Sequence, residues 1–471
     1  MQASEMQRVL EVQKQAYIRE GIPSLERRRD WIDRSIALLK KHDMQFVETL
    51  NADFGNRSKT QSYLADIFST VNTLKHARKH MKRWMRNEYR STGMPMRLFG
   101  SRTELRYQPL GTVGCISPWN FPVNLTFAPL GCIFAAGNRA MIKPSEFTEN
   151  TSALMTELIS EYYDESEMAC FPGGPEVGTA FSALPFDHLL FTGATSIAKH
   201  VMRAASENLV PVTLELGGKS PVVLGRSADF ELAAKRIMAG KTLNAGQICI
   251  APDYAMVPSD SVGKFVESAK SAVGTMYPDL KHNQDYTSIL NQRHYERING
   301  YLEDARDKGA EVVEINPAGE DFSQQDSYRI PPTLVLEPTD DMQLMQDEIF
   351  GPVLPVKSYQ NVDEAVDYVN EKERPLALYY FGSDSREREK VLSSTISGGV
   401  SVNDVIWHIG EEEYPFGGVG PSGTGHYHGI DGFKNFSHAR TVLHQSKFEK
   451  FMAMARPPYA ENAINRFKGM M

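Results

Sequence analysis

A regular alternation of short β-like runs with helical runs, extending from Gly111 to Gly225, constrains the fold of this chain more than any other feature. The strand candidates are residues 112–116, 139–142, 188–191, 211–216 and 221–224, with helix candidates such as 148–162 and 196–206 between them. Parallel strands need a crossover between them, and a helix is the usual crossover. The alternation therefore predicts an α/β fold with a doubly wound, mostly parallel sheet.

A second alternation of the same kind runs from about Asp229 to Asn403. Its strand candidates are residues 254–257, 333–336, 376–381 and 400–402. A chain of 471 residues is too long for a single hydrophobic core. We therefore expect two or three domains, together with N-terminal helices in residues 6–90, where apolar residues recur at helical spacing.

The charge of the chain argues against a polyanionic partner. Its formal net charge is −8, whereas nucleic acid and anionic membranes attract a basic surface. The basic run from His76 to Arg83 is typical of the solvated face of a helix. The longest apolar run, residues 125–137, is too short to cross a bilayer. We expect no nucleic-acid partner and no membrane partner.

Four cysteines are spread along the chain, at positions 115, 132, 170 and 249. Their spacing fits no CxxC or Cys/His zinc pattern, so we expect no metal site. So few cysteines in a chain of this length indicate reduced thiols, and not a disulfide framework. The first residues lack the basic and apolar regions of a signal peptide. These features favour a cytoplasmic location.

Cys249 lies among small residues in the stretch from Asn244 to Pro252. A thiolate is a strong nucleophile, although the ordinary pKa of a thiol leaves only a small fraction ionised at neutral pH. We expect Cys249 at a junction between a loop and a helix, where a helix N-terminus would raise that fraction. Taken alone, this cysteine also fits a small buried side chain of the core.

Glu215 lies on the face of its predicted strand opposite to Val212, Leu214 and Leu216. The carboxyl end of a parallel strand is where α/β enzymes place their sites. The strand and helix that follow would bring the chain back to Cys249 beside Glu215. A carboxylate there can activate a thiol or a water, although it also fits a solvated charge at a strand end.

Asn120 follows the first strand candidate, in the sequence SPWNFP at residues 117–122. The two prolines favour extended backbone in the residues before them and stiffen the turn that presents Asn120. A fixed side-chain amide is a good donor to an oxyanion. The alternative is an amide that only bonds its own turn.

Two further strand ends suit a dinucleotide. Lys143 and Glu146 close one strand candidate and can grip ribose hydroxyls, since an acidic residue there favours a free 2′-hydroxyl and a lysine tolerates a 2′-phosphate. Gly193 and Thr195 lie where another strand ends and a helix begins, so that a pyrophosphate can approach the helix start. The choice between NAD and NADP stays open.

Two glycine motifs are set aside. The sequence GVGPSG at residues 418–423 matches GxGxxG, but it follows no clear strand and contains a proline, so we interpret it as a structural loop. The sequence GKS at residues 218–220 is similar to the end of a phosphate-binding loop. That motif needs a glycine at position 213, which is Thr213.

Taken together, these segments resemble the NAD(P)-dependent aldehyde dehydrogenase superfamily, most strongly between Leu110 and Arg440. The motifs that carry the resemblance are PWNFP (118–122), KPSE (143–146), FTG (191–193), LELGGKSP (214–221), GQIC (246–249), EIFGP (348–352) and PFGGVG (415–420). Each is moderately specific, and all of them in this order are very specific. The segments LALYYF (376–381), NDVI (403–406) and GHYHG (425–429) are similar to the class 3 and fatty-aldehyde branch.

The resemblance implies that an aldehyde is oxidised to its acid through a thioester on Cys249. Asn120 and the backbone N–H of Cys249 would hold the oxyanion, and Glu215 would activate water. Glu348 and Phe350 resemble the pair that orients the nicotinamide ribose and ring. The cofactor-binding residues implied for NAD or NADP are Lys143, Glu146, Gly193, Thr195, Glu348 and Phe350.

The implied substrate is a small-molecule aldehyde, which we expect to be aromatic and similar to coniferyl aldehyde. Trp119, Phe121, Ile406 and Trp407 are candidate pocket walls. Ala239 stands where some class 3 relatives have tryptophan, so the pocket would be wider there.

Three alternatives stay open. The first is a medium- or long-chain aliphatic aldehyde as substrate. The second is acyl transfer to coenzyme A, against which Glu215 argues because relatives with that activity generally lack it. The third is a non-catalytic protein that keeps the fold, against which the set of Asn120, Glu215 and Cys249 argues.

The resemblance also implies a division of the chain and a homodimer. Residues 1–90 would add helices to the cofactor domain, 91–108 would form an oligomerisation hairpin arm, and 109–216 would bind NAD(P). Residues 217–408 would form the catalytic domain. Residues 409–471 would form a glycine-rich loop and an oligomerisation tail.

Overall fold

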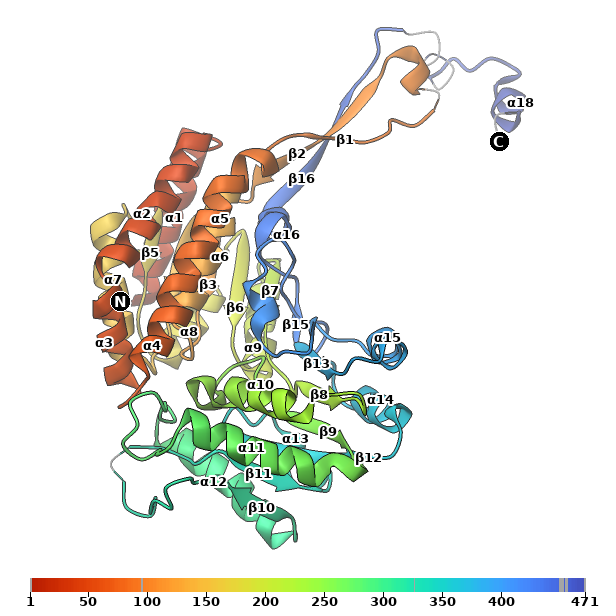
Figure 1. The fold of residues 1–471 in the computed structure, drawn as a ribbon. Coiled ribbons are helices and arrows are strands. Elements are labelled where there is room, and N and C mark those ends of the chain that lie inside the picture. The colour runs from red at the N-terminus through yellow and green to blue at the C-terminus, as the bar shows by residue number, and fades with distance from the viewer. Residues whose placement is uncertain (1, 95, 326, 449–452, 454–455, 470–471) are drawn as a thin grey trace.

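Two mostly parallel sheets and a projecting three-stranded arm make up the molecule (Figure 1). The computed structural model describes residues 2–94, 96–325, 327–448, 453 and 456–469. The chain passes from the first sheet to the second directly after Glu215, so that the two sheets meet at the segment between residues 215 and 221.

The first sheet has six strands in the order β15-β7-β6-β3-β4-β5. In that order they are Gly423–Thr424, Val212–Glu215, His188–Thr192, Thr112–Ile116, Arg139–Lys143 and Met168–Cys170. Every pairing is parallel except that of β15 with β7. Because β3 lies between β4 and β6, the chain winds outward from β3 in both directions. This confirms the predicted doubly wound sheet.

The second sheet has seven strands in the order β10-β11-β12-β9-β8-β13-β14. In that order they are Glu311–Glu314, Thr333–Leu336, Val353–Tyr359, Tyr254–Pro258, Pro221–Leu224, Ala377–Phe381 and Gly399–Val402. Only β10 runs antiparallel to its neighbour. Strands β9 and β13 are buried along their whole length, as expected for parallel strands covered on both faces.

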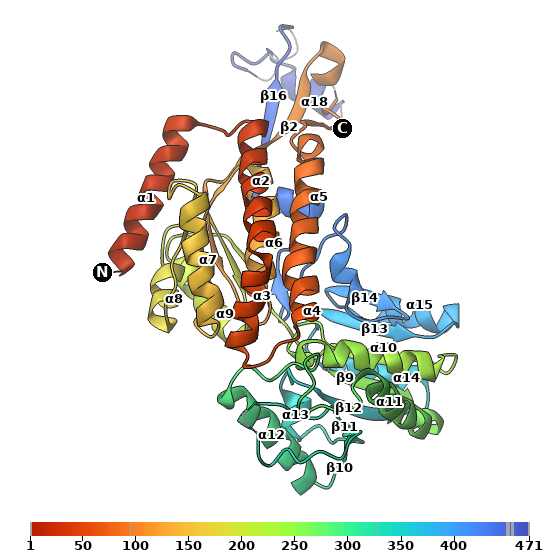
Figure 2. The same cartoon turned by 60° about the vertical axis from the view of Figure 1, so that its left-hand side comes forward.

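Helices cover both sheets, and the predicted N-terminal helices are confirmed. Those of the first part are α1 (Gln2–Glu20), α2 (Leu25–Lys41), α3 (Asp43–Asp53), α4 (Lys59–Ser62), a π-helix (Tyr63–Phe68), α5 (Ser69–Trp84), α6 (Asn124–Ala136), α7 (Glu149–Tyr162), α8 (Pro175–Ser182) and α9 (Thr195–Ser206). Helices α2, α5 and α6 pack against one another (Figure 2). Those around the second sheet are α10 (Phe230–Thr242), α11 (Val262–Met276), α12 (Gln292–Asp307), α13 (Gln343–Gln346), α14 (Val362–Glu371) and α15 (Ser385–Ser394).

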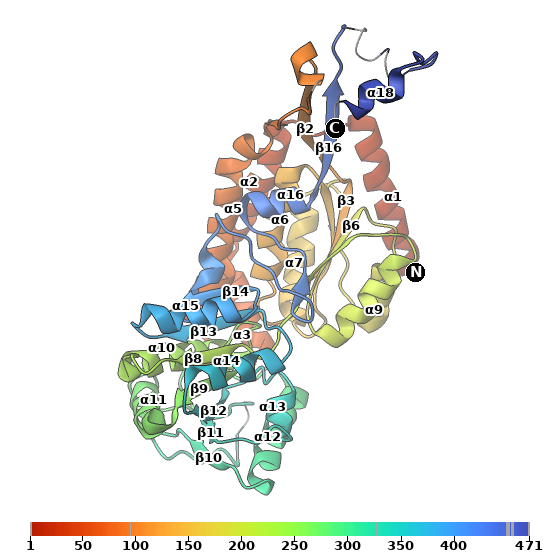
Figure 3. The ribbon, with the colours of Figure 1, turned by 90° about the vertical axis from the view of Figure 1, so that its right-hand side faces the viewer.

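The arm extends away from both sheets, at the top of Figure 3. Strand β2 (Arg102–Pro109) pairs along its length with β16 (Ser437–His444), which follows α16 (Gly429–Asn435), and over two residues with β1 (Glu88–Tyr89). The long partner of β2 is therefore a distant C-terminal strand, and β16 forms one edge of the arm. Pro95 and positions 455, 470 and 471 of the polar tail lie outside the described residues.

No helix within the described ranges is both long enough and apolar enough to cross a membrane.

Candidate active site

The expected site residues come from opposite ends of the two sheets. Asn120 follows β3, Lys143 ends β4, Gly193 follows β6 and Glu215 ends β7, so these positions share the carboxyl edge of the first sheet. The other positions precede strands of the second sheet. Cys249 lies before β9, and Glu348 and Phe350 lie before β12.

Cys249 lies in a turn between a short 3₁₀ helix (Leu243–Gly246) and β9, partly exposed. The predicted junction between a loop and a helix is therefore wrong, because the chain enters a strand after this turn. The pKa of the Cys249 thiol is raised to about 12, chiefly by burial and then by the charges of Glu348 and Glu215. The backbone N–H groups of Cys249 and Ile250 act in the opposite direction. The resting thiol is protonated and needs a base.

The segment before Cys249 has an unusual backbone. Asn244 and Ala245 both have positive φ angles, 49° and 51°, a conformation that is strained for residues other than glycine. At Gly246 an added Cβ would lie 2.3 Å from the Gly351 carbonyl oxygen, so only glycine fits there. Buried Gln247 fixes the turn, since its Nε2 donates to the carbonyl oxygens of Asn244 at 2.9 Å and Ser288 at 3.1 Å.

Glu215 is almost fully buried, with 2 % of its surface exposed. Neither carboxylate oxygen has a hydrogen-bond partner among the described residues. Burial holds the pKa of Glu215 well above its ordinary value. An unpaired buried carboxyl group is costly to the fold, and one beside a thiol is suited to exchanging a proton with a substrate or a water.

The side chain of Asn120 is held against the turn that carries Cys249. Its Nδ2 donates to the backbone carbonyl oxygen of Gln247 at 3.1 Å, and the backbone carbonyl oxygen of Asn120 accepts from Asn244 Nδ2 at 3.2 Å. A primary amide has two N–H donors. One of them fixes the orientation of Asn120, and the second stays available to an oxyanion.

A buried ion pair supports the turn around Asn120. Arg57 donates to Asp66 at 2.8 Å, and both side chains are almost completely buried. The second oxygen of Asp66 accepts from the backbone N–H groups of Val123 and Asn124, both at 3.1 Å, where α6 begins. The Arg57 guanidinium also lies 5.0 Å from the ring of Phe121. The pair therefore ties the turn to α6 and to the π-helix.

Glu348 lies where the two sheets meet. Burial raises the pKa of its carboxyl group to about 8, and the charge of Asp253 adds to the effect. The backbone N–H of Gly218 donates to it. A Cβ on Gly217 would lie 2.4 Å from Glu348 Oε1, so a side chain at that position would displace the carboxylate.

Lys219, part of the rejected GKS motif, has a structural role. Its ammonium donates to Asp253, to the Leu344 carbonyl oxygen at 2.6 Å and to the Asp347 carbonyl oxygen at 2.9 Å. Asp253 in turn accepts from the Ile349 N–H at 2.9 Å. These bonds fix the chain on both sides of Glu348.

Phe350 and Trp119 are in contact, although they come from different sheets. Their ring centroids lie 5.3 Å apart in an edge-to-face arrangement, which aromatic pairs prefer. Phe350 has a positive φ of 48°, a strained backbone for a bulky residue. On its other sides Trp119 contacts Phe54 at 6.2 Å and His294 at 5.1 Å.

The expected nucleotide residues fit a dinucleotide. Lys143 Nζ donates to Glu146 at 2.8 Å, and the carboxylate is the more exposed partner. Gly193 and Thr195 surround the start of α9, where backbone N–H groups can meet an anion. Thr195 Oγ1 donates to the Pro421 carbonyl oxygen at 3.2 Å. The GVGPSG segment therefore packs on this helix start as a loop.

The candidate pocket walls differ in exposure. Phe121 is partly buried under Arg57. Ile406 has a positive φ of 69° and packs close to Gly240, where an added Cβ would lie 3.2 Å from Ile406 Cδ1. Trp407 remains 65 % exposed.

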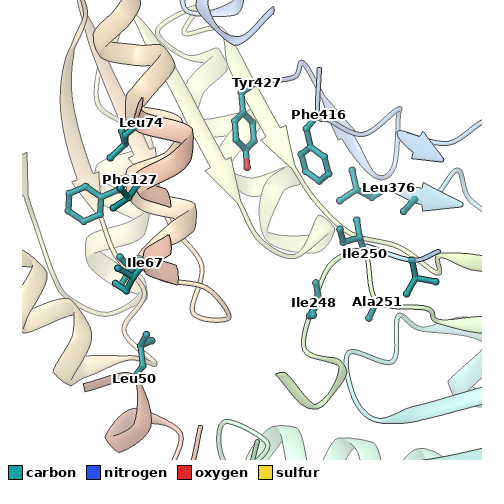
Figure 4. Packing of buried hydrophobic residues seen from close by; sticks show 14 of the residues in the cluster. Leu50, Ile67, Leu74, Phe127, Ile248, Ile250, Ala251, Leu376, Phe416 and Tyr427 are labelled. Atoms are coloured by element: carbon teal, nitrogen blue, oxygen red, sulfur yellow. The ribbon is translucent and has the colours of Figure 1, made fainter. Parts of the chain in front are cut away.

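The structure adds aromatic neighbours that carried no role in the sequence interpretation. Tyr427 and Phe416 belong to the same hydrophobic cluster as Ile248 and Ile250, the chain neighbours of Cys249, and Figure 4 labels all four. Tyr427 is buried, and its pKa is raised well above the ordinary value by burial and then by the charges of Glu215 and Cys249. In the sequence, its segment GHYHG indicated only a resemblance to the class 3 and fatty-aldehyde branch. No local pattern predicts that a tyrosine so far along the chain lies near the thiol.

Comparisons with known proteins agree with this architecture. A model of the aldehyde dehydrogenase family matches residues 2–442. A "Probable coniferyl aldehyde dehydrogenase" of Caulobacter vibrioides is 58% identical over 99% of this chain and 96% of its own length. A "Coniferyl aldehyde dehydrogenase" of a Pseudomonas species is 51% identical over 98% and 95%. The substrate-bound structure of Staphylococcus aureus AldH has a TM-score of 0.91, is 33% identical and covers 98% of both chains.

Proposed function

The chain belongs to the aldehyde dehydrogenase family and is an enzyme that uses NAD or NADP, and from that premise we propose that its substrate is an aromatic aldehyde similar to coniferyl aldehyde. The product is the carboxylic acid. The names of the two relatives support the substrate class, since this chain covers nearly all of their length.

One observation carries the assignment of the catalytic residues. The unpaired, buried carboxyl group of Glu215 interacts electrostatically with the Cys249 thiol. A fold that keeps such a group without a partner loses stability. A loss of folding stability of this kind is typical of residues that take part in catalysis.

In the first step Cys249 attacks the carbonyl carbon of the aldehyde. The thiol must lose its proton, and its pKa of about 12 means that the protein must provide a base. Glu215 is placed to accept this proton, because its raised pKa makes it a stronger base than an ordinary carboxylate. A sulfur–carbon bond forms and the carbonyl electron pair moves onto oxygen.

The oxyanion receives the free N–H of the Asn120 amide and the backbone N–H of Cys249. Both donors are held before the reaction, Asn120 through Gln247 and the backbone through the strained turn. Donors fixed in this way stabilise the charge without reorganising.

A bound nicotinamide would supply the hydride acceptor, and loss of the hydride from the substrate carbon would leave a thioester on Cys249. Lys143 and Glu146 hold the adenine ribose, and Gly193 and Thr195 leave room for the pyrophosphate at the start of α9. Glu348 and Phe350 orient the nicotinamide side, fixed by the clamp of Lys219 and Asp253.

Hydrolysis completes the cycle. Glu215 first releases the thiol proton to solvent and then accepts a proton from water as the water oxygen attacks the thioester carbon. The carbon–sulfur bond breaks, the acid leaves, and the thiolate of Cys249 returns. Residues Trp119, Phe121, Ile406 and Trp407 are proposed to contact the substrate.

We further propose a cytoplasmic homodimer. The projecting arm leaves β16 as an edge strand with mostly exposed residues, and an exposed edge can pair with a second chain. Light scattering after size-exclusion chromatography measures the mass, and a monomer at all protein concentrations would exclude the dimer.

The substrate proposal is tested by comparing kcat/KM for coniferyl aldehyde and for a medium-chain aliphatic aldehyde, each with NAD and with NADP. We expect the aromatic aldehyde to be preferred. A preference for the aliphatic aldehyde would overturn the substrate class. The product is also analysed with and without coenzyme A, since formation of an acyl-coenzyme A in place of the free acid would overturn hydrolysis.

A further inference from the structure

Three metal-ligating side chains gather outside the site described above. His76 and His80 lie one turn apart on α5, and Glu413 lies in the segment that follows the 3₁₀ helix Trp407–Gly410. Glu413 Oε1 is 3.5 Å from His76 Nε2 and 3.8 Å from His80 Nε2. The three ligand atoms all lie within 4.8 Å of one another.

The spacing matches the size of a metal centre. Residues i and i+4 share one face of a helix. Zinc binds imidazole nitrogen and carboxylate oxygen at about 2.0–2.2 Å, so two ligands of one tetrahedral ion lie about 3.3 Å apart. The two measured separations exceed this value by only a few tenths of an ångström, which small side-chain rotations can close.

A second observation points to a ligand. Nε2 of His76 is buried and has no hydrogen-bond partner among the described residues, although buried polar atoms are normally paired.

Neighbouring groups orient the ligands. The rings of His76 and His80 stack with centroids 4.4 Å apart, and both lie near the ring of Trp84. Arg83 donates to Glu413 Oε2 at 3.4 Å, which leaves Oε1 directed toward the two imidazoles. Hydrogen bonds of this kind to the non-ligating atom fix metal-binding carboxylates.

We propose that His76, His80 and Glu413 form a binding site for one divalent transition-metal ion, with zinc as the best match and water completing the coordination. Two imidazoles and one carboxylate suit zinc better than calcium or magnesium, which prefer oxygen ligands. The positive charges of Lys79 and Arg83 act on His76 and weaken the affinity.

The ion would fasten α5 to the segment that carries Glu413. The preceding residue, Glu412, already accepts a hydrogen bond from Thr73 on the same helix. The chain then reaches Phe416, whose ring lies 6.0 Å from that of Tyr427. The site therefore stabilises a segment that runs to the aromatic wall near Cys249.

The test is a titration of the full-length protein with Co²⁺ and with Zn²⁺ alone, in a Cys249→Ser background that removes one of the two partly exposed thiols. Co²⁺ is used because its visible absorption reports tetrahedral coordination and separates nitrogen and oxygen ligands from sulfur. We expect one ion per chain, displaced by Zn²⁺, without sulfur-to-metal bands.

The variants His76→Gln, His80→Gln and Glu413→Gln should each weaken binding at least about tenfold. His282→Gln is the matched control, because His282 is exposed and lies away from the cluster, and it should leave the affinity unchanged. Circular dichroism checks the fold of each variant.

Unchanged affinity in His80→Gln, or the absence of saturable binding at a large excess of zinc, would overturn the proposal. If a variant loses its fold, anomalous scattering from zinc-soaked crystals of the unaltered chain decides. A peak between the three side chains supports the site, and its absence there rejects it.

Discussion

The two sheets present opposite ends to the candidate active site. The six-stranded sheet contributes its carboxyl edge, with Asn120, Lys143 and Glu215 in or directly after strands, as parallel sheets usually do. The seven-stranded sheet contributes its amino edge, where Cys249 and Glu348 lie in segments that lead into β9 and β12. The general rule for α/β enzymes therefore describes one half of this site and not the other.

The backbone differs in the same way. Among the described residues, positive φ angles at non-glycine positions near the site occur at Asn244, Ala245, Phe350 and Ile406, all on the side of the second sheet. Asn120 and Glu215 have none. Each strained residue costs on the order of 1–3 kcal/mol. The first sheet positions its groups by regular strands, whereas the second uses strained turns held by partners such as Gln247.

The largest expected effect comes from the second sheet. Cys249→Ala removes the nucleophile and should lower kcat for aldehyde oxidation by at least about 10⁴-fold. The measurement is aldehyde-dependent formation of NADH or NADPH, with cofactor binding by fluorescence as the control. Full turnover in this variant would show that Cys249 is not the nucleophile and that the second sheet does not supply it.

The next effect comes from the first sheet. Glu215→Gln keeps the shape of the side chain and removes the base, so steady-state turnover should fall by about 10²–10⁴-fold. Because this base serves both thiol activation and hydrolysis, both steps should slow, and mass spectrometry of quenched enzyme should find any trapped acyl group on Cys249. The comparison would fail if the acyl group were found on another residue.

Asn120→Ala tests the contact between the two sheets. Loss of one oxyanion donor should lower kcat by about 10²–10³-fold. Asn120 also donates to the Gln247 carbonyl oxygen, so melting temperature is measured alongside. A fall in stability with unchanged kcat would assign Asn120 a structural role only.

The pH dependence separates the carboxyl group of Glu215 from ordinary carboxylates. Because its pKa is held well above the usual value, Glu215 is largely protonated in acid and becomes an active base as the pH rises. Turnover limited by hydrolysis should therefore increase with pH, by up to about tenfold per unit below that pKa. The residual rate of Glu215→Gln should lose this dependence, and an equally steep profile in the variant would assign the base elsewhere.

The smallest expected effect concerns specificity. We propose that Ala239, an exposed residue of α10, lies beside the substrate, so Ala239→Trp should lower kcat/KM for coniferyl aldehyde relative to a short aliphatic aldehyde by about tenfold or more. The ratio of the two kcat/KM values is the measurement, since it is independent of enzyme concentration. Equal losses for both aldehydes would place Ala239 outside the substrate path.

Much of the fold was predictable because strand position is a local property. Residues 112–116, 221–224 and 333–336 were predicted as strands, and β3, β8 and β11 have these bounds. Strands β5 and β12 were not predicted. Strand β5 spans only three residues. Strand β12 contains Pro355, and a proline argues against a strand prediction.

The candidate site was only partly accessible from the sequence. Residue types and motif order pointed to Cys249 and Glu215, and these roles remain proposals. The expected helix after Cys249 was wrong, since the small residues around it serve a tight turn that enters β9. Tyr427 had no local signal, and His76 and His80 were visible only as part of a basic run, because Glu413 lies far along the chain from both histidines.

The sequence by itself determined most of the alternation of strands and helices, the family, and the side chains with the chemistry for a thioester. It did so because periodicity, turn residues and motif spacing depend on near neighbours in the chain. Only the tertiary structure decided that the second sheet offers its amino edge, that Glu215 has no hydrogen-bond partner in the described part of the chain, and that Glu413 lies beside two histidines. Burial, charge and ligand geometry arise from contacts between distant segments, which no local pattern encodes.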